Sequence, residues 1–208
     1  LARNTESKEE EKTSLTIFDQ ELNVKWTRVQ EFPYADKQIV LDDISLSNEG
    51  AVLITARLYE SARERDLASD TFKYKFFIIT EKGTKEVNIE PGVGKFATNA
   101  VISPGEANGY FVGGLYALTS GGTLIRDCGY YGIRVDKETG KQISMLCQPF
   151  GEGELQYAAK KEDDGQPEWK DFKIRKGTTF SDGSHAMLAT YAKRTEYSNA
   201  NFSSIYYD

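Results

Sequence analysis

Histidine chemistry in this chain depends on one residue, His185, because the sequence contains a single histidine. That count restricts Ser-His-Asp and Cys-His catalysis to this residue and leaves no set of histidines for a metal site. His185 follows the Ser-Asp-Gly-Ser sequence at 181–184, which is typical of a turn and lacks the Gly-x-Ser-x-Gly pattern of a nucleophilic serine. We therefore expect His185 to be a structural residue in a strand that follows this turn.

The two cysteines, Cys128 and Cys147, flank a hairpin that we predict around a turn at 137–140. Pairing across that turn makes the two cysteines near neighbours on adjacent strands. A disulfide in an oxidising compartment and two buried free thiols are both compatible with this placement. The spacing is not the Cys-x-x-Cys of zinc sites or redox enzymes.

Two pairs of adjacent carboxylates occur, Asp42-Asp43 and Asp163-Asp164. A glycosidase needs two acids that face each other across a cleft, but adjacent residues in a strand point to opposite faces. The second pair lies in a polar stretch without the Asp-x-Asp-x-Asp-Gly spacing of an EF-hand. We predict surface or turn positions for these carboxylates.

Glycines cluster at 92–94, 113–114 and 121–122. None of these clusters precedes a helix or a Lys-Ser/Thr pair, as a phosphate-binding loop would require. Turns and tight packing between neighbouring repeats explain them better.

Five aromatic residues could in principle form a sugar-binding platform: Trp26, Tyr59, Tyr116, Trp169 and Tyr191. Three of them, the tyrosines, occupy the same position in a sequence repeat. Equivalent repeat positions usually serve packing between units, so packing is the prediction for these tyrosines.

The elements that would position these residues are two kinds of hairpin that alternate along the chain. One kind occurs at 17–26, 78–87 and 133–143, and a fourth copy begins at 205. The other contains a short strand, a turn and a longer strand, at 44–59, 101–116 and 179–191. Two hairpins per unit give four strands every 50 to 60 residues or so, a period typical of the blades of a β-propeller.

Two insertions lengthen this period. Residues 149–173 predict a surface loop, with room for a short helix at 155–160, and the charged residues 60–71 predict a loop or one to two helical turns. Residues 1–13 are mostly charged and predict a flexible tail or linker, followed by a repeat domain at 14–208.

Composition narrows the function classes. The 208 residues include 12 Tyr and 11 Phe, which favours β structure, and a net charge of −6 argues against binding to a phosphate backbone. No apolar run reaches the length of a membrane-spanning helix. Neither nucleic acid nor a membrane span is expected.

The predicted fold is all-β: a β-propeller-like array of about three four-stranded blades that forms part of a larger propeller. Propellers usually have four to eight blades, so either a partner or further residues must complete the ring. A β-sandwich is the alternative.

The motifs Ile-Phe-Asp-x-x-Leu-Asn-x-x-Trp at 17–26 and Asp-Asp-Ile-Ser-Leu-Ser-Asn-Glu-Gly at 42–50 carry a resemblance. They resemble motifs of large, mostly uncharacterised bacterial envelope proteins with propeller-like repeats. The resemblance covers residues 15–208 and implies a secreted, periplasmic or outer-membrane-associated protein. It carries over no catalytic residue. The insertion at 149–173 and the low blade count depart from the pattern.

These observations predict a non-catalytic binding or assembly scaffold that recognises a protein or a glycan through blade loops. The candidate binding residues lie in the two insertions: Arg63, Arg65, Asp163, Asp164 and Trp169. No catalytic residue, metal or cofactor is predicted. The alternative is a carbohydrate-active or hydrolytic propeller enzyme whose site needs further blades.

Overall fold

The computed structural model describes residues 10–35, 37–66, 72–104, 109–120, 123–151, 172–191, 194–199 and 202–207. Over these residues the fold is all-β, with antiparallel sheets and one short helix. The elements are β1 (Glu10–Phe18), β2 (Val24–Ala35), β3 (Ile39–Leu46), β4 (Val52–Tyr59), α1 (Ala62–Asp66), β5 (Phe72–Thr80), β6 (Gly83–Ile89), β7 (Lys95–Ala97), β8 (Val101–Ser103), β9 (Tyr110–Ser120), β10 (Thr123–Val135), β11 (Gln142–Pro149), β12 (Phe172–Thr179), β13 (His185–Tyr191), β14 (Arg194–Asn199) and β15 (Phe202–Tyr207).

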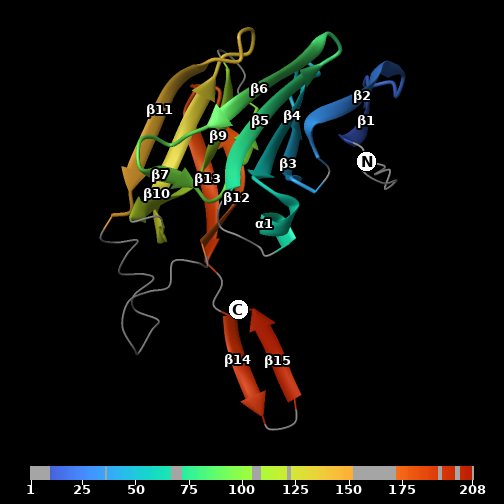
Figure 1. Cartoon of the computed structure of the whole chain (residues 1–208). Coiled ribbons are helices and arrows are strands. Elements are labelled where there is room, and N and C mark those ends of the chain that lie inside the picture. The colour runs from blue at the N-terminus through green and yellow to red at the C-terminus, as the bar shows by residue number, and fades with distance from the viewer. Residues whose placement is uncertain are drawn as a thin grey trace.

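Four sheets follow one another along the chain, and we name them A to D. Sheet A is the pair β1–β2, sheet B is β3-β4-β5-β6, sheet C contains β7 to β11, and sheet D is the pair β12–β13. Strands β14 and β15 form a separate two-stranded sheet, which Figure 1 shows projecting away from the others. Sheets B and C contain the same up-and-down order of four strands, β3 to β6 and β8 to β11.

The predicted alternation of two hairpin types is confirmed by the turns that join the strands. Asp19 and Asp136 begin the turns of one hairpin type, in which their backbone N–H groups bond to the carbonyl oxygens of Asn23 and Lys141, four and five residues further along. The turns of the other hairpin type, at 47–51 and 180–184, are closed by equivalent N–H···O=C bonds from Ser47 to Ala51 and from Phe180 to Ser184. Each of these two turns has a glycine with a φ of about +82°. That left-handed conformation favours glycine.

The sheets pack face to face through three separate apolar clusters. Because side chains alternate between the faces of a strand, sheet B buries one set of residues against sheet A and the other against sheet C. The first cluster contains Leu15, Phe32, Ile39, Val52, Ile54, Ala56, Phe77 and Ile79. The second includes Leu53, Tyr74, Phe76, Ile78, Tyr110, Val112, Tyr131, Ile133 and Val135. The third, between sheets C and D, contains Val101, Leu115 and Ile174.

Strands β3 of sheet B, β8 of sheet C and β12 of sheet D, each the first strand of a repeated hairpin, lie next to one another. The backbone N–H of Ile102 in β8 donates to a carboxylate oxygen of Asp43 in β3 at 2.9 Å. On the other side of β8, the hydroxyl oxygen of Ser103 lies 2.6 Å from that of Thr179 in β12. Successive units are therefore linked through equivalent strands, and each sheet contacts its neighbours in sequence.

The ends of the strands differ from the prediction in one place. Strand β1 begins at Glu10, so the last four residues of the predicted tail belong to a strand. The cause is the length of β2, whose pairing with β1 extends to Ala35 opposite Glu10 and buries Thr13. The insertion at 60–71 begins with the single helical turn α1, while the predicted helix at 155–160 lies outside the described residues.

A polar link joins sheet A to the outer strands of sheet B. Glu86 in β6 accepts hydrogen bonds from Lys75 Nζ in β5 and from the hydroxyl of Tyr34 in β2, each at 2.6 Å. Burial by itself raises the pKa of Glu86, but these hydrogen bonds outweigh it and hold the pKa below its ordinary value of 4.5.

We expect Glu86→Gln to lower the free energy of unfolding by roughly 0.5–1 kcal/mol at pH 7. A carboxylate with a lowered pKa stabilises the fold above its ordinary pKa, and this contribution disappears as the pH falls through the lowered value. The difference between variant and wild type should therefore shrink at pH 3. Urea unfolding at both pH values tests this, with the exposed Glu90→Gln as control. An equal difference at the two pH values would contradict it.

Candidate functional site

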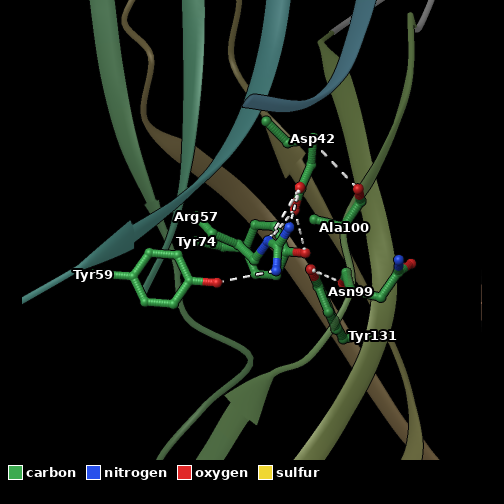
Figure 2. A network of polar contacts seen from close by, with 8 residues as sticks. Asp42, Arg57, Tyr59, Tyr74, Asn99, Ala100 and Tyr131 are labelled. Atoms are coloured by element: carbon green, nitrogen blue, oxygen red, sulfur yellow. Dashed lines mark hydrogen bonds and ion pairs between the residues drawn. The ribbon is translucent and has the colours of Figure 1, made fainter. Parts of the chain in front are cut away.

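A network of polar contacts centred on Asp42 lies where sheets B and C meet (Figure 2). Arg57 donates from Nε and Nη2 to both carboxylate oxygens of Asp42 at 2.9–3.1 Å. Tyr74 donates its hydroxyl to the same carboxylate at 2.7 Å, and Arg57 Nη1 lies 3.1 Å from the Tyr59 hydroxyl. On the side of sheet C, the Tyr131 hydroxyl donates to the Asn99 carbonyl at 2.9 Å.

The bonds of this cluster join strands within sheet B and, separately, within sheet C, and they are poorly suited to proton transfer. Burial, followed by the negative charge of Asp42, raises the pKa of Tyr74, and burial raises the pKa of Tyr131. Both phenols therefore stay protonated at physiological pH. Burial by itself lowers the pKa of Arg57, but the bonds to Asp42 reverse that effect. The Asp42 carboxylate is occupied by a cation and a phenol, so we assign the cluster a structural role.

Asp42 and Asp43 behave as separate groups, as their adjacency in sequence predicts. Asp42 binds Arg57 within sheet B, whereas Asp43 accepts the backbone N–H of Ile102 in sheet C. Asp42 is exposed, as the predicted surface position requires, whereas Asp43 is half-buried; both belong to β3 and bind neighbouring strands, so neither lies in a turn. The pairing of β3 with β4 is irregular between Leu41 and Asp43, which indicates a bulge at Asp42.

His185 is a half-buried residue of the interface between sheets C and D. It begins β13 directly after the predicted turn, and its ring stacks on Phe111 with centroids 3.9 Å apart. Nδ1 lies 2.9 Å from the hydroxyl oxygen of Thr179, whereas Nε2 is buried without a hydrogen-bond partner. Burial, with a smaller effect of the charge of Arg134, lowers the pKa of His185 and favours the neutral ring. These contacts agree with the predicted structural role.

A second arrangement has the features of a binding site: a groove of about 540 Å³ at one edge of sheets A, B and C. Figure 1 shows the turns of successive hairpins at this edge, with α1 at the opposite edge. We call it the turn-edge groove. Its lining residues are Lys25, Trp26, Glu49, Gly50, Ala51, Ile78, Thr80, Glu81, Lys82, Gly83, Thr84, Lys85, Tyr110, Lys137 and Glu138.

Four lysines line the turn-edge groove, and they differ in how they are held. Lys137 Nζ lies 2.5 Å from a carboxylate oxygen of Glu49 and 5.7 Å from the ring centre of Tyr110. Lys85 Nζ donates to the backbone carbonyls of Lys137 and Glu138, which links β6 to the next turn. Lys25 and Lys82 are exposed and form no ion pair with any described residue.

The aromatic residues divide between the groove and the core. Tyr59 and Tyr116 are buried in the cluster between sheets B and C, which confirms their predicted role in packing. Trp26 is half-buried against the cluster between sheets A and B and also lines the turn-edge groove. Trp169 and the side chain of Tyr191 lie outside the described residues.

The predicted binding residues belong to the opposite edge or to segments that the structure does not describe. Arg63 is exposed on α1, and Arg65 belongs to the same helix. Asp163 and Asp164 lie outside the described residues, as does Trp169. Sequence reasoning favoured these residues because long insertions often carry binding loops. The signal for the groove lay in the repeated turns themselves. Lys137 is the second residue of the turn that begins at Asp136, and Lys82 is the third residue of the turn that begins at Thr80.

The register of sheet C places the two cysteines on neighbouring strands, as predicted, but not opposite each other. Cys147 pairs with Tyr131, three residues along β10 from Cys128. Cys147 is a free, half-buried thiol that packs at the edge of the cluster between sheets B and C.

Comparison with known proteins finds no matching family model, no matching curated protein and no matching solved structure. Within the described ranges, no three or more His, Cys, Asp or Glu side chains are grouped so that they could hold a metal ion. No helix in the described part of the chain is long and apolar enough to cross a membrane.

Proposed function

We propose that this protein is a non-catalytic binding or assembly scaffold of the bacterial envelope, built as a segment of a β-propeller. It recognises a protein or glycan ligand at the turn-edge groove. The observation that carries this proposal is the composition of the groove, which combines turns from three successive sheets with an aromatic ring and two unpaired lysines. Sites formed by loops from consecutive blades are the usual way in which repeat scaffolds present a binding surface.

The propeller arrangement is supported by the way in which the sheets follow one another. Sheet B is buried on both faces, by sheet A through Phe77 and by sheet C through Phe76. A two-layered sandwich needs burial on only one face of each sheet. The adjacent first strands β3, β8 and β12 also fit the inner strands of blades arranged around an axis.

The turn-edge groove is lined by four lysines and three glutamates, and its exposed lysines offer charge contacts to an anionic ligand. Lys85 and Lys137 bind groups of neighbouring turns, whereas Lys25 and Lys82 are exposed. Trp26 offers an aromatic surface between sheets A and B, and such rings stack on sugars or on apolar side chains. Carboxylate-bearing glycans and acidic peptides both present these features.

The test compares ligand binding by Lys25→Ala/Lys82→Ala with that of wild type on a panel of neutral and acidic glycans and peptides. Losing two exposed charge contacts should weaken an acidic ligand by about tenfold, and added salt should reduce the difference. The control is Lys37→Ala/Lys73→Ala, which removes two exposed lysines near the opposite edge. Equal weakening by both double variants, or no binding to any acidic member, would contradict the proposal.

A further inference from the structure

Sheet D has a free strand edge beside an open groove. Among the described strands, β13 pairs only with β12, so the other edge of β13 carries unpaired backbone groups. A groove of about 480 Å³ lies there, and its lining includes Gly132 and Arg134 of β10, Leu146 of β11, and His185 and Met187 of β13. In sheet B, the third strand β5 pairs with the corresponding edge of β4. The groove therefore lies where a third strand of sheet D would pack on sheet C.

The equivalent surface of sheet B is covered. Val87 in β6 lies opposite Phe76, and Leu146 in β11 lies opposite Gly132. Phe76 and Gly132 are equivalent, because each precedes the first residue of the following turn by four residues. Val87 is half-buried against the cluster between sheets B and C, which includes residues of the third strand of sheet C. Leu146 is 59% exposed, so the surface around it is open where its counterpart is covered.

The sequence of β15 fits the open place. In sheets B and C, the third-strand residue that precedes the turn, Ile79 or Val135, pairs with the first residue of the second strand, Val52 or Tyr110. In the fourth copy of this hairpin sequence, which begins at 205, the same position belongs to Tyr207. The position is apolar or aromatic in each of these copies, as burial against a preceding sheet requires.

This equivalence predicts how β15 would align with β13. His185 is the first residue of β13, so Tyr207 would lie opposite it, and Ile205 would lie opposite Met187. In sheets B and C, the first and third residues of the second strand pack on the preceding sheet. His185 and Met187 face sheet C in the same way, since both line the groove. Ile205 and Tyr207 would therefore cover the groove.

The hairpin that contains β15 has little to hold it in place. It pairs β15 with β14 and projects away from the other sheets (Figure 1). A two-stranded hairpin on its own is only marginally stable in water. Moving β15 to β13 replaces its six residue pairs with β14 by an equal number with β13. The move therefore conserves the pairing of β15 and adds apolar burial, which favours docking.

We propose that residues 202–207 exchange between the hairpin with β14 and the free edge of β13, where they form a strap that closes the groove. Residues 192–201 would join β13 to the docked strap, much as residues 60–71 join β4 to β5. When the strap opens, the edge of β13 and the apolar surface around Leu146 become accessible together. The exchange goes beyond the proposed binding function and does not depend on what the turn-edge groove binds.

Disulfide trapping tests the docked strand. Ser204 lies opposite Leu188 in the proposed register and opposite Tyr197 in the hairpin. Residues directly opposite each other have Cβ atoms about 5 Å apart, so Leu188→Cys/Ser204→Cys and Tyr197→Cys/Ser204→Cys should each form a disulfide under mild oxidation. The control is Val29→Cys/Ser204→Cys, which places one thiol on an exposed residue of sheet A.

Peptide mass spectrometry separates these disulfides from links to the native Cys128 and Cys147, and a non-reducing gel separates links within one chain from links between chains. A Leu188→Cys/Ser204→Cys variant that links no faster than the control, or only between two molecules, would overturn the proposal. Absence of the disulfide in Tyr197→Cys/Ser204→Cys would overturn the exchange with the hairpin.

A second substitution tests which face of the strap covers the groove. Adding Ile205→Lys to Leu188→Cys/Ser204→Cys would place a cation beside Met187 and Arg134, and it should slow disulfide formation at least about tenfold. Tyr206→Lys puts the same charge on the opposite face and should change the rate less than about twofold. Equal slowing by both would overturn the proposed register. Ligand binding at the turn-edge groove should be the same with and without Ile205→Lys, so it is tested separately.

Discussion

Replacing Gly114 with alanine is expected to lower the free energy of unfolding by about 3 kcal/mol or to prevent folding. A Cβ atom at this position in β9 would lie 1.8 Å from the carbonyl oxygen of Asn99. That oxygen belongs to the backbone and also accepts the hydrogen bond of the buried Tyr131 hydroxyl. Relief of the clash would thus displace the connection between β7 and β8 and break a buried hydrogen bond.

The matched control is Gly83→Ala, because a Cβ atom at Gly83 would meet no atom within 4 Å. Alanine reduces the conformational freedom of the unfolded chain, so this variant should be neutral or more stable by up to about 1 kcal/mol. Urea unfolding followed by far-ultraviolet circular dichroism gives both values. A Gly114→Ala variant within 0.5 kcal/mol of wild type would show that the connection yields easily, contrary to the expectation.

Truncating Phe76 to alanine is expected to cost about 3–5 kcal/mol, because the ring is fully buried between sheets B and C. Phe77→Ala should cost a similar amount through a different interface, since its ring packs on Phe32 of sheet A with centroids 4.9 Å apart. The two residues are neighbours in sequence and support opposite faces of one strand. Val93→Ala, at a fully exposed residue, should change stability by less than about 0.5 kcal/mol.

Hydrogen exchange distinguishes the two phenylalanine variants. Phe76→Ala should lower amide protection most in β9 and β10, which pack on its face of sheet B, whereas Phe77→Ala should lower it most in β1 and β2. Stability in a row of sheets is carried by contacts between neighbours, so each loss should remain local. The same protection pattern in both variants would contradict the assignment of these faces.

The hairpins could be predicted from sequence because turn chemistry is local. Gly50 and Gly183 occupy positions where the backbone takes positive φ, and Asp19 and Asp136 accept hydrogen bonds from backbone N–H groups within their own turns. These residues mark each turn within a few positions. Gly114 was predicted to lie in a turn or at tight packing between neighbouring repeats. The packing is tight, but the atom that the glycine makes room for, the Asn99 carbonyl, adjoins β8 of the same sheet C and cannot be predicted from a strand pattern.

Contacts between distant parts of the chain could not be predicted in the same way. The adjacent carboxylates of Asp42 and Asp43 resemble a solvated pair in the sequence. The partners of Asp42, Arg57 and Tyr74, come near only when the strands of sheet B pair, and Ile102, the partner of Asp43, comes near only when sheets B and C pack. Strand β1 extends into the charged residues 10–13 because β2 offers a long edge for pairing. Tertiary contacts override local preference at both places.

The sequence suggested a binding site in the long insertions, whereas the structure has a groove at the short turns. This difference also arises from contacts between distant parts of the chain. Sequence length draws attention to residues 60–71 and 149–173, whereas the groove needs three turns to meet at one edge. Lys25 and Lys82 are 57 residues apart in sequence and become neighbours of one groove only through the packing of sheets A and B. The sequence shows that both lysines belong to repeated hairpins, but it does not show that the two hairpins meet at one groove.

The two edges of the sheets join their strands by different means, and this asymmetry bears on how such a protein can diversify. At the turn edge, short turns with fixed hydrogen bonds set which residues of neighbouring strands face each other. At the opposite edge, the joins differ in length, from the segment with α1 to the stretch between β11 and β12. Lengthening a join there costs little chain entropy and leaves strand alignment untouched. The molecule can therefore vary one side freely while the other keeps a constant geometry.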